Sequence, residues 1–254
     1  MQKLLSTKMG RAFEFRKARK FKRWGAMAKT FSRLGKDIVI AVKEGGTDPE
    51  SNPKLRAVIQ NCKAANMPLA NVDRAIKKAS DKDTSDYKEV NFEGYGPHGI
   101  AVLVECATDN NQRTVANVRS YFNKTNGNLA TTGSVSFMFD HHSHFKIKKG
   151  DLDLEELEFD LIDFGAEEVF IEQADEEDKS EDGEETIVIY GSFESFGSLQ
   201  SEIEKKGYEI ISSGFERIPQ QTKELTEEQS EEVGKLIEKL EEDEDVQNVY
   251  HNMV

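Results

Sequence analysis

The spacing of apolar residues first changes near residue 80, and this change constrains the fold more than any other feature. Before it, apolar side chains recur every three or four residues, which is typical of amphipathic helices. The clearest such set is Met27, Phe31, Leu34, Ile38 and Val42. Beyond the polar segment 80–86 the spacing falls to two, which is typical of strands. The chain therefore joins a helical N-terminal part to a part that contains strands as well as helices.

Three helices are expected in the N-terminal part. The first covers residues 27–42 and ends at Gly45-Gly46. The second begins with Asn52 as its N-cap and Pro53 as its first helical residue. The third runs from about residue 68 to residue 79. We expect residues 1–80 to form one small helical domain.

The next segment predicts a hairpin followed by further elements. Its turn is Gly94-Tyr-Gly-Pro-His-Gly99, a cluster of residues that favour turns. The expected elements are strands over 88–95, 100–106 and 135–139, with a helix over 111–124. At the other end of the chain the capping box Thr226-x-x-Gln229 predicts a helix, followed by a strand over 246–250. This helix–strand pair cannot bury its apolar face alone, and the earlier segment lacks a second helix and a final edge strand, so we expect 81–140 and 218–254 to form one discontinuous domain.

The intervening residues alternate regularly between strand and helix. The expected strands cover 145–148, 168–171, 186–190 and 208–212, and the expected helices cover 153–165 and 195–206. This βαββαβ order is that of the ferredoxin-like arrangement. We therefore expect an α+β protein of three domains, in which a small basic helical domain precedes two ferredoxin-like α/β domains. One of these, residues 141–217, is inserted in the other.

Charge divides the chain at the same place as the apolar spacing. The whole chain carries 34 Lys+Arg and 48 Asp+Glu, a net charge of −14. Residues 1–80 hold 19 of the bases and only 6 of the acids, so their net charge is +13 and that of the remainder is −27. Such an asymmetry indicates a basic element attached to an acidic body.

The basic residues are densest between Arg11 and Arg23, where seven bases stand against one acid. On a helix most of them share one face, while Phe13, Phe21 and Trp24 lie opposite. A basic face can follow a phosphate backbone, and aromatic rings can stack on unpaired bases. Two other interpretations are a solvated helix face and an arm that neutralises the acidic domains. The predicted nucleic-acid-binding residues are Arg11, Arg16, Lys17, Arg19, Lys20, Lys22, Arg23, Trp24, Lys29, Arg33, Lys36, Arg56 and Lys63.

Two glycine- or polar-rich motifs favour structural roles. The letters Gly94-x-Gly96-x-x-Gly99 match a dinucleotide fingerprint, but a strand follows where that fingerprint needs a helix. A hairpin turn is the better interpretation. The segment 109–114 opens a helix whose free N–H groups could hold an anion, although capping by Asp109 or Asn110 with Arg113 exposed explains it as well.

The sequence offers little for catalysis or for a cofactor. His141, His142 and His144 have no carboxylate or cysteine at a ligand spacing, so we expect no metal site, and a hydrolase built on them is the weakest hypothesis. Cys62 and Cys106 are 44 residues apart and indicate neither zinc nor a disulfide framework. The segment 172–185 holds nine acids and predicts a disordered, solvated loop, with mimicry of phosphate as an alternative. We expect a protein that is not an enzyme and needs no cofactor.

Several ordered blocks resemble the YebC/PmpR family of transcriptional regulatory proteins, which has a mitochondrial branch of translational activators. The blocks include Lys29-Thr-Phe-Ser-Arg-Leu34, Asn52-Pro-Lys-Leu-Arg56, Lys63-Ala-Ala-Asn-Met-Pro68, Asn71-Val-Asp-Arg-Ala-Ile76, Glu93-Gly-Tyr-Gly-Pro97 and Gly127-Asn-Leu129. The resemblance runs from about Met9 to the C-terminus and implies a three-domain α+β fold. Many members open with Gly-His-Ser-Lys-Trp-Ala, where this chain has Gly10-Arg-Ala-Phe-Glu14, so contacts of that block are not carried over.

Together these features predict a cytoplasmic regulator that binds DNA through its basic N-terminal domain. The alternative is a ribosome-associated translation factor whose basic domain meets ribosomal RNA. In both cases the acidic domains are free to face protein partners. The absence of a long apolar run and of a signal peptide predicts no membrane partner.

Overall fold

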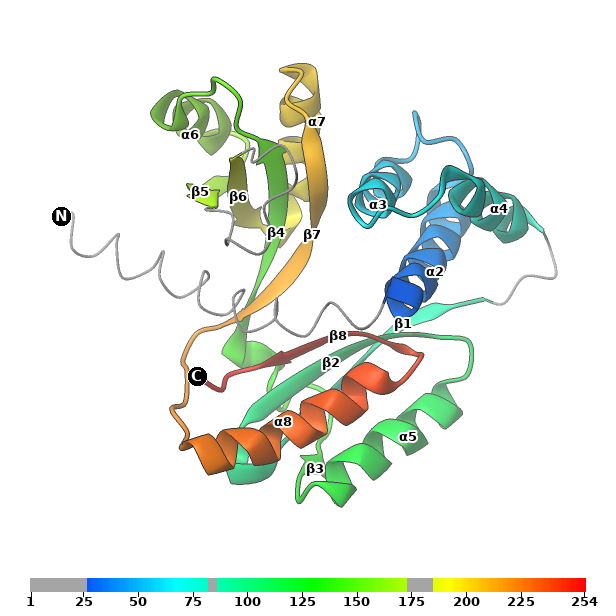
Figure 1. The fold of residues 1–254 in the computed structure, drawn as a ribbon, viewed down its shortest axis with the longest axis vertical. Helices are drawn as coiled ribbons and strands as arrows, with labels where there is room; N and C mark the ends of the chain where they lie inside the picture. Colours follow the sequence, from blue (N-terminus) through cyan, green and yellow to red (C-terminus); the bar gives the residue numbers. More distant parts are fainter. Residues whose placement is uncertain (1–26, 82–85, 173–184) are drawn as a thin grey trace. The chain divides into compact units, whose positions relative to one another are not determined.

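The structure, a computed structural model, describes residues 27–81, 86–172 and 185–254, and it separates into two compact units. The first unit holds the described residues up to Glu44 with residues 75–140 and 217–254. The second holds residues 45–74 and 141–216. The strands pair antiparallel in two sheets, and helices pack against them, so the described chain is of the α+β class (Figure 1).

The three N-terminal helices are confirmed. They are α2 (Met27–Gly45), α3 (Pro53–Ala64) and α4 (Leu69–Ser80). Asn52 caps α3, because its Oδ1 accepts a hydrogen bond from the backbone N–H of Leu55 at 3.0 Å. That residues 1–80 form one domain stays a prediction.

The first sheet has the strand order β3-β1-β2-β8. Its strands are β1 (Lys88–Tyr95), β2 (Ala101–Thr108), β3 (Asn128–Leu129) and β8 (Val246–His251). The predicted hairpin is confirmed, since β1 pairs antiparallel with β2. Gly94 is needed for packing, because a Cβ there would lie 2.6 Å from Cε1 of Phe122. Gly99 has a φ of +71°, which favours glycine in the turn.

Helices α5 (Asn111–Lys124) and α8 (Glu227–Glu242) cover one face of this sheet (Figure 1). Val118 and Phe122 of α5 share a core with Leu236 and Leu240 of α8. Both parts of the predicted capping box at Thr226 and Gln229 are formed. Because β8 pairs with β2, the C-terminal segment completes the sheet begun by residues 88–129, which is the association that the sequence predicted for these segments.

The predicted strand over 135–139 is wrong. Ser136–Met138 form a single 3-10 turn, and strand β4 (Phe139–Lys148) begins only after it. The N–H groups of Val135 and Ser136 donate to the carboxylate of Glu93, so they are not available to a strand partner. Val135 and Phe139 pack instead with Leu103 on the sheet face opposite α5 and α8.

The second sheet has the strand order β5-β6-β4-β7. Its other strands are β5 (Ala166–Glu172), β6 (Thr186–Ser192) and β7 (Ile210–Pro219), and its helices are α6 (Leu154–Ile162) and α7 (Phe196–Lys205). Both helices pack on one face, where Leu161 and Leu199 meet Phe145 and Ile189. The elements follow the predicted βαββαβ order. The acidic segment 172–185 lies mostly outside the described residues.

Candidate nucleic-acid interface

Most of the predicted nucleic-acid-binding residues precede the described part of the chain. Those outside it are Arg11, Arg16, Lys17, Arg19, Lys20, Lys22, Arg23 and Trp24. Lys29, Arg33 and Lys36 lie on α2, and Arg56 and Lys63 lie on α3. These five residues divide into two that face solvent and three that are held by other parts of the protein.

Lys29 and Lys63 are the two exposed bases of this set. Lys29 lies in the first turn of α2, and Lys63 lies in the last turn of α3. Neither side chain has a hydrogen bond or ion pair with a described residue. Both side chains are exposed to solvent.

Arg33 and Lys36 connect α2 by hydrogen bonds to the segment between α8 and β8, within the first unit. The Arg33 guanidinium donates to the carbonyl oxygen of Glu241 at 2.9 Å. Lys36 is only 8% exposed, and its Nζ donates to the carbonyls of Ala107 and Glu244 and to Oδ1 of Asp245. Because an ammonium has three donors, Lys36 has none left for a phosphate.

Asp245 is the centre of a buried polar cluster. Its Oδ1 accepts from Lys36 at 3.0 Å, and its Oδ2 accepts from Arg113 at 2.7 Å and from the Thr114 hydroxyl at 2.8 Å. Burial alone would raise the pKa of Asp245, but the hydrogen bonds from Arg113 and Lys36 outweigh it and hold the pKa below its ordinary value. This cluster joins α2, α5 and the turn before β8 within the first unit.

The same cluster decides between the two interpretations of residues 109–114. Asn110 is the N-cap of α5, and its Oδ1 accepts from the N–H of Arg113. The Arg113 guanidinium pairs with Asp109 and Asp245. The capping interpretation is therefore correct, and the Arg113 side chain, which is 48% exposed, also pairs with these two carboxylates.

Arg56 is held in the second unit. Its Nε and Nη2 donate to the two carboxylate oxygens of Glu204, each at 3.1 Å. Its Nη1 donates to the carbonyls of Pro49 and Glu50. A bidentate ion pair of this kind fixes the plane of the guanidinium group. Arg56 therefore connects α3 to α7 and to the loop before α3.

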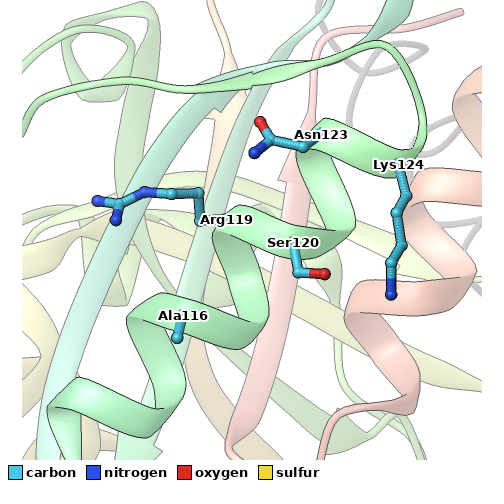
Figure 2. A pocket seen from close by; sticks show the side chains of 5 residues that line it. All are labelled: Ala116, Arg119, Ser120, Asn123 and Lys124. Atoms are coloured by element: carbon cyan, nitrogen blue, oxygen red, sulfur yellow. The ribbon is translucent and has the colours of Figure 1, made fainter.

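Sequence reasoning missed two exposed bases on α5. Arg119 and Lys124 border a shallow hollow of about 410 Å³ that Ala116, Ser120 and Asn123 also line. Figure 2 shows the two basic side chains on opposite sides of the helix, with Ala116 and Ser120 between them. Neither base has a partner among the described residues. The available signal was the run 110–139, which contains Arg113, Arg119 and Lys124 but no acid.

The three histidines predicted to lack a metal role contact aromatic rings, and His142 and His144 share the ring of Tyr190. His141 stacks on Phe193, Nδ1 of His142 lies 3.2 Å from Glu167, and His144 is tilted against Tyr190. Across the described ranges, no three histidine, cysteine, aspartate or glutamate residues converge as a metal site would need. Among the described helices, none has both the length and the apolar character needed to cross a membrane.

Comparisons with known proteins agree over nearly the whole chain. Residues 11–82 match the family description "TACO1/YebC protein N-terminal domain", and residues 87–253 match "TACO1/YebC second and third domain". A relative from Flavobacterium johnsoniae is 67% identical and one from Parabacteroides distasonis is 60% identical; both are named "Probable transcriptional regulatory protein". Each alignment covers 96% of this chain, and 99% and 97% of the respective relatives.

A solved structure shares the fold. The crystal structure of a conserved hypothetical protein from Aquifex aeolicus is 36% identical, with a TM-score of 0.72. The match covers 91% of both chains. The resemblance predicted from the sequence blocks is thus confirmed, and the chain belongs to the TACO1/YebC family, the YebC/PmpR group of regulatory proteins.

Proposed function

We propose that the protein is a regulator without enzymatic activity that binds DNA through its basic N-terminal residues. The observation that carries the proposal is the charge division, +13 in residues 1–80 against −27 in the rest. A duplex carries about one negative charge per 1.7 Å of its axis, so affinity depends chiefly on a concentrated basic surface. The names of the relatives as transcriptional regulatory proteins support the same role.

The contacts that we assign to DNA are the bases between Arg11 and Arg23 with Lys29 and Lys63. Arg33, Lys36 and Arg56 are left out, because their donors are bound to carbonyl and carboxylate oxygens of the protein. In this proposal Arg33 and Lys36 fix the direction of α2, the helix that follows the basic segment. They would position the interface without touching the nucleic acid.

The acidic remainder has a complementary role in this proposal. Its two sheet-and-helix segments, which we take as the second and third of three domains, repel phosphate and would face protein partners. This leaves the basic residues as the favoured point of contact with DNA. We place the activity in the cytoplasm, since Cys62 and Cys106 are both buried and neither forms a disulfide.

A salt titration tests the proposal. If about six phosphates are neutralised, the logarithm of the affinity for duplex DNA should fall against the logarithm of salt concentration with a slope of roughly −5. A matched pair of double variants shows where the contact lies. R19E/K20E should lose binding, whereas K235E/K239E, with the same charge change on exposed residues of α8, should keep it. A salt-independent affinity, or equal losses in both variants, would contradict DNA binding by the N-terminal residues.

The second candidate is a translation factor that docks on the ribosome, and the opposite charges of the two parts favour it. The basic part would meet ribosomal RNA, while the acidic part would reach toward basic ribosomal proteins. Sedimentation through a sucrose gradient separates this candidate from the first. A chain that travels with 70S ribosomes at physiological salt supports it, and one that stays at the top of the gradient rules it out.

A further inference from the structure

One stretch of the acidic body contains no acid at all. Residues 110–139 are thirty consecutive residues without Asp or Glu, although residues 81–254 hold 42 acids in 174 positions. At that density about seven acids would be expected in thirty residues. The stretch builds α5, β3 and the loop that leads to β4. The side chains of this stretch therefore add no negative charge that would repel a polyanion.

The loop in this stretch is held by a buried carboxylate. Glu93 is 3% exposed, and its oxygens accept from the N–H groups of Gly133 at 2.7 Å, Val135 at 2.6 Å and Ser136 at 2.8 Å. Tyr95 adds a hydrogen bond from its hydroxyl to the carbonyl of Ser134. No cation accompanies Glu93 among the described residues. Three charge-assisted hydrogen bonds thus offset the cost of burying the charge, and their result is one fixed loop conformation.

The fixed loop presents an aromatic ring to solvent. Phe137 is 69% exposed, while its neighbours Val135 and Phe139 are buried in the core. The backbone is tied on both sides of the ring, since Ser136 donates to Glu93 and the carbonyl of Met138 accepts from Gln220. A ring carried on a fixed backbone loses less conformational entropy on binding than one on a mobile loop, which suits it to a contact.

Phe159 provides an internal comparison. It is 81% exposed on α6, but Glu158 precedes it, and Glu155 and Glu156 lie one turn away; Asp160, which follows it, pairs with Lys206. Phosphate would be repelled there. Phe137 has no acid before it back to Asp109, and the first acid after it, Asp140, accepts a hydrogen bond from Gln220. Exposure alone does not distinguish the two rings, but the surrounding charge does.

We propose that Phe137 stacks on an unpaired base of a nucleic acid, and that Glu93 is the positioning residue that holds the ring in place. The inference rests on the proposed nucleic-acid binding and adds a second contact, outside the basic N-terminal residues. Every base has a π-face, so the contact takes single-stranded DNA or RNA without a required sequence. A duplex, whose bases are already stacked, does not use it.

The test uses the full chain with single strands that contain 2-aminopurine, whose fluorescence falls when it stacks. Wild type should quench the probe, and F137A should bind at least about fivefold more weakly without quenching. F137W should retain both properties, F137L should behave as F137A, and F159A should behave as wild type. Duplex affinity should be the same in all variants. Parallel DNA and RNA strands show which of the two is preferred.

The positioning role of Glu93 is tested by asking whether the effect of its substitution on binding depends on Phe137. Glutamine in E93Q offers one acceptor oxygen where the carboxylate offers two, so the loop loses part of its support. E93Q should weaken single-strand binding in the wild-type background and have no further effect in F137A. Unchanged binding by F137A, equal losses in F137A and F159A, or full retention by F137L would overturn the inference. Failure of wild type to bind any nucleic acid would instead refute the proposed function.

Discussion

The burial of a single lysine shows why residue type alone misassigns a role. Lys36 lies among the bases of α2 and follows the same spacing as Lys29 and Arg33. Its ammonium is nevertheless enclosed by two carbonyls and Asp245, a residue 209 positions away in the chain. No local pattern of the sequence could reveal this pairing, because it depends on how β8 returns beside β2.

Replacing Lys36 by methionine should destabilise the first unit by about 3 kcal/mol, because one partner of a buried ion pair is removed. Methionine keeps the length and the helix propensity of lysine, so the loss reports the charge. The control is K43M on the same helix. Lys43 pairs with Asp86, whose side chain is 75% exposed, and the cost there should stay below about 1 kcal/mol. Urea denaturation compares the two variants, and equal effects would contradict the structural role of Lys36.

Glu93 makes the stability of the first unit depend on pH. Burial alone would raise its pKa, but hydrogen bonds from the N–H groups of Gly133, Val135 and Ser136 outweigh burial, so the pKa lies below the ordinary value of 4.5. A carboxyl with a lowered native pKa stabilises the fold above its ordinary pKa, and this contribution is lost as the pH falls through the native value.

The difference in stability between wild type and E93Q should therefore be constant from neutral pH down to about 5 and shrink below 4.5. Thermal melting at a series of pH values measures it. Other carboxyls titrate in the same range, but they are common to both proteins and cancel in the difference. A difference that stays constant down to pH 3 would show that the Glu93 charge does not support the loop.

At the scale of elements, the sequence correctly predicted helices whose ends are set by contacts between residues close together in the chain. The helix over 111–124 has the predicted bounds, and the capping box at Thr226 opens α8 as expected. The wrong element is the strand over 135–139, whose N–H groups bond to Glu93, more than forty positions earlier. The two-residue strand β3 is too short to give a periodic signal and was not predicted.

The capping box gives an element-scale prediction. The Thr226 hydroxyl accepts from the N–H of Gln229, and the Gln229 side chain accepts from the N–H of Thr226. T226A should leave the N–H of Gln229 without its acceptor and cost about 1 kcal/mol of the stability of the first unit, which depends on α8 for its core. T222A, an exposed threonine four residues earlier, is the control and should change little. A loss in T222A as large as that in T226A would refute the capping argument.

At the scale of the whole molecule, the net charge of −14 is the sum of two unlike parts. A chain average of this sign argues against a nucleic-acid partner, whereas the division at residue 80 argues for one. Family membership follows from matches along nearly the entire chain. These matches do not decide between DNA and ribosomal RNA as the partner, since both present the same phosphate charge to a basic surface.

Reversing the charge of six N-terminal bases separates binding from folding. The variant carries glutamate in place of Arg16, Lys17, Arg19, Lys20, Lys22 and Arg23. We expect it to lose nucleic-acid binding, because phosphate is now repelled where it was attracted. The cores of the two sheets are built from residues beyond 90, so their thermal melting should be nearly unchanged. A binding loss with unaltered melting assigns these residues to the interface, whereas a large fall in melting temperature assigns them to the fold.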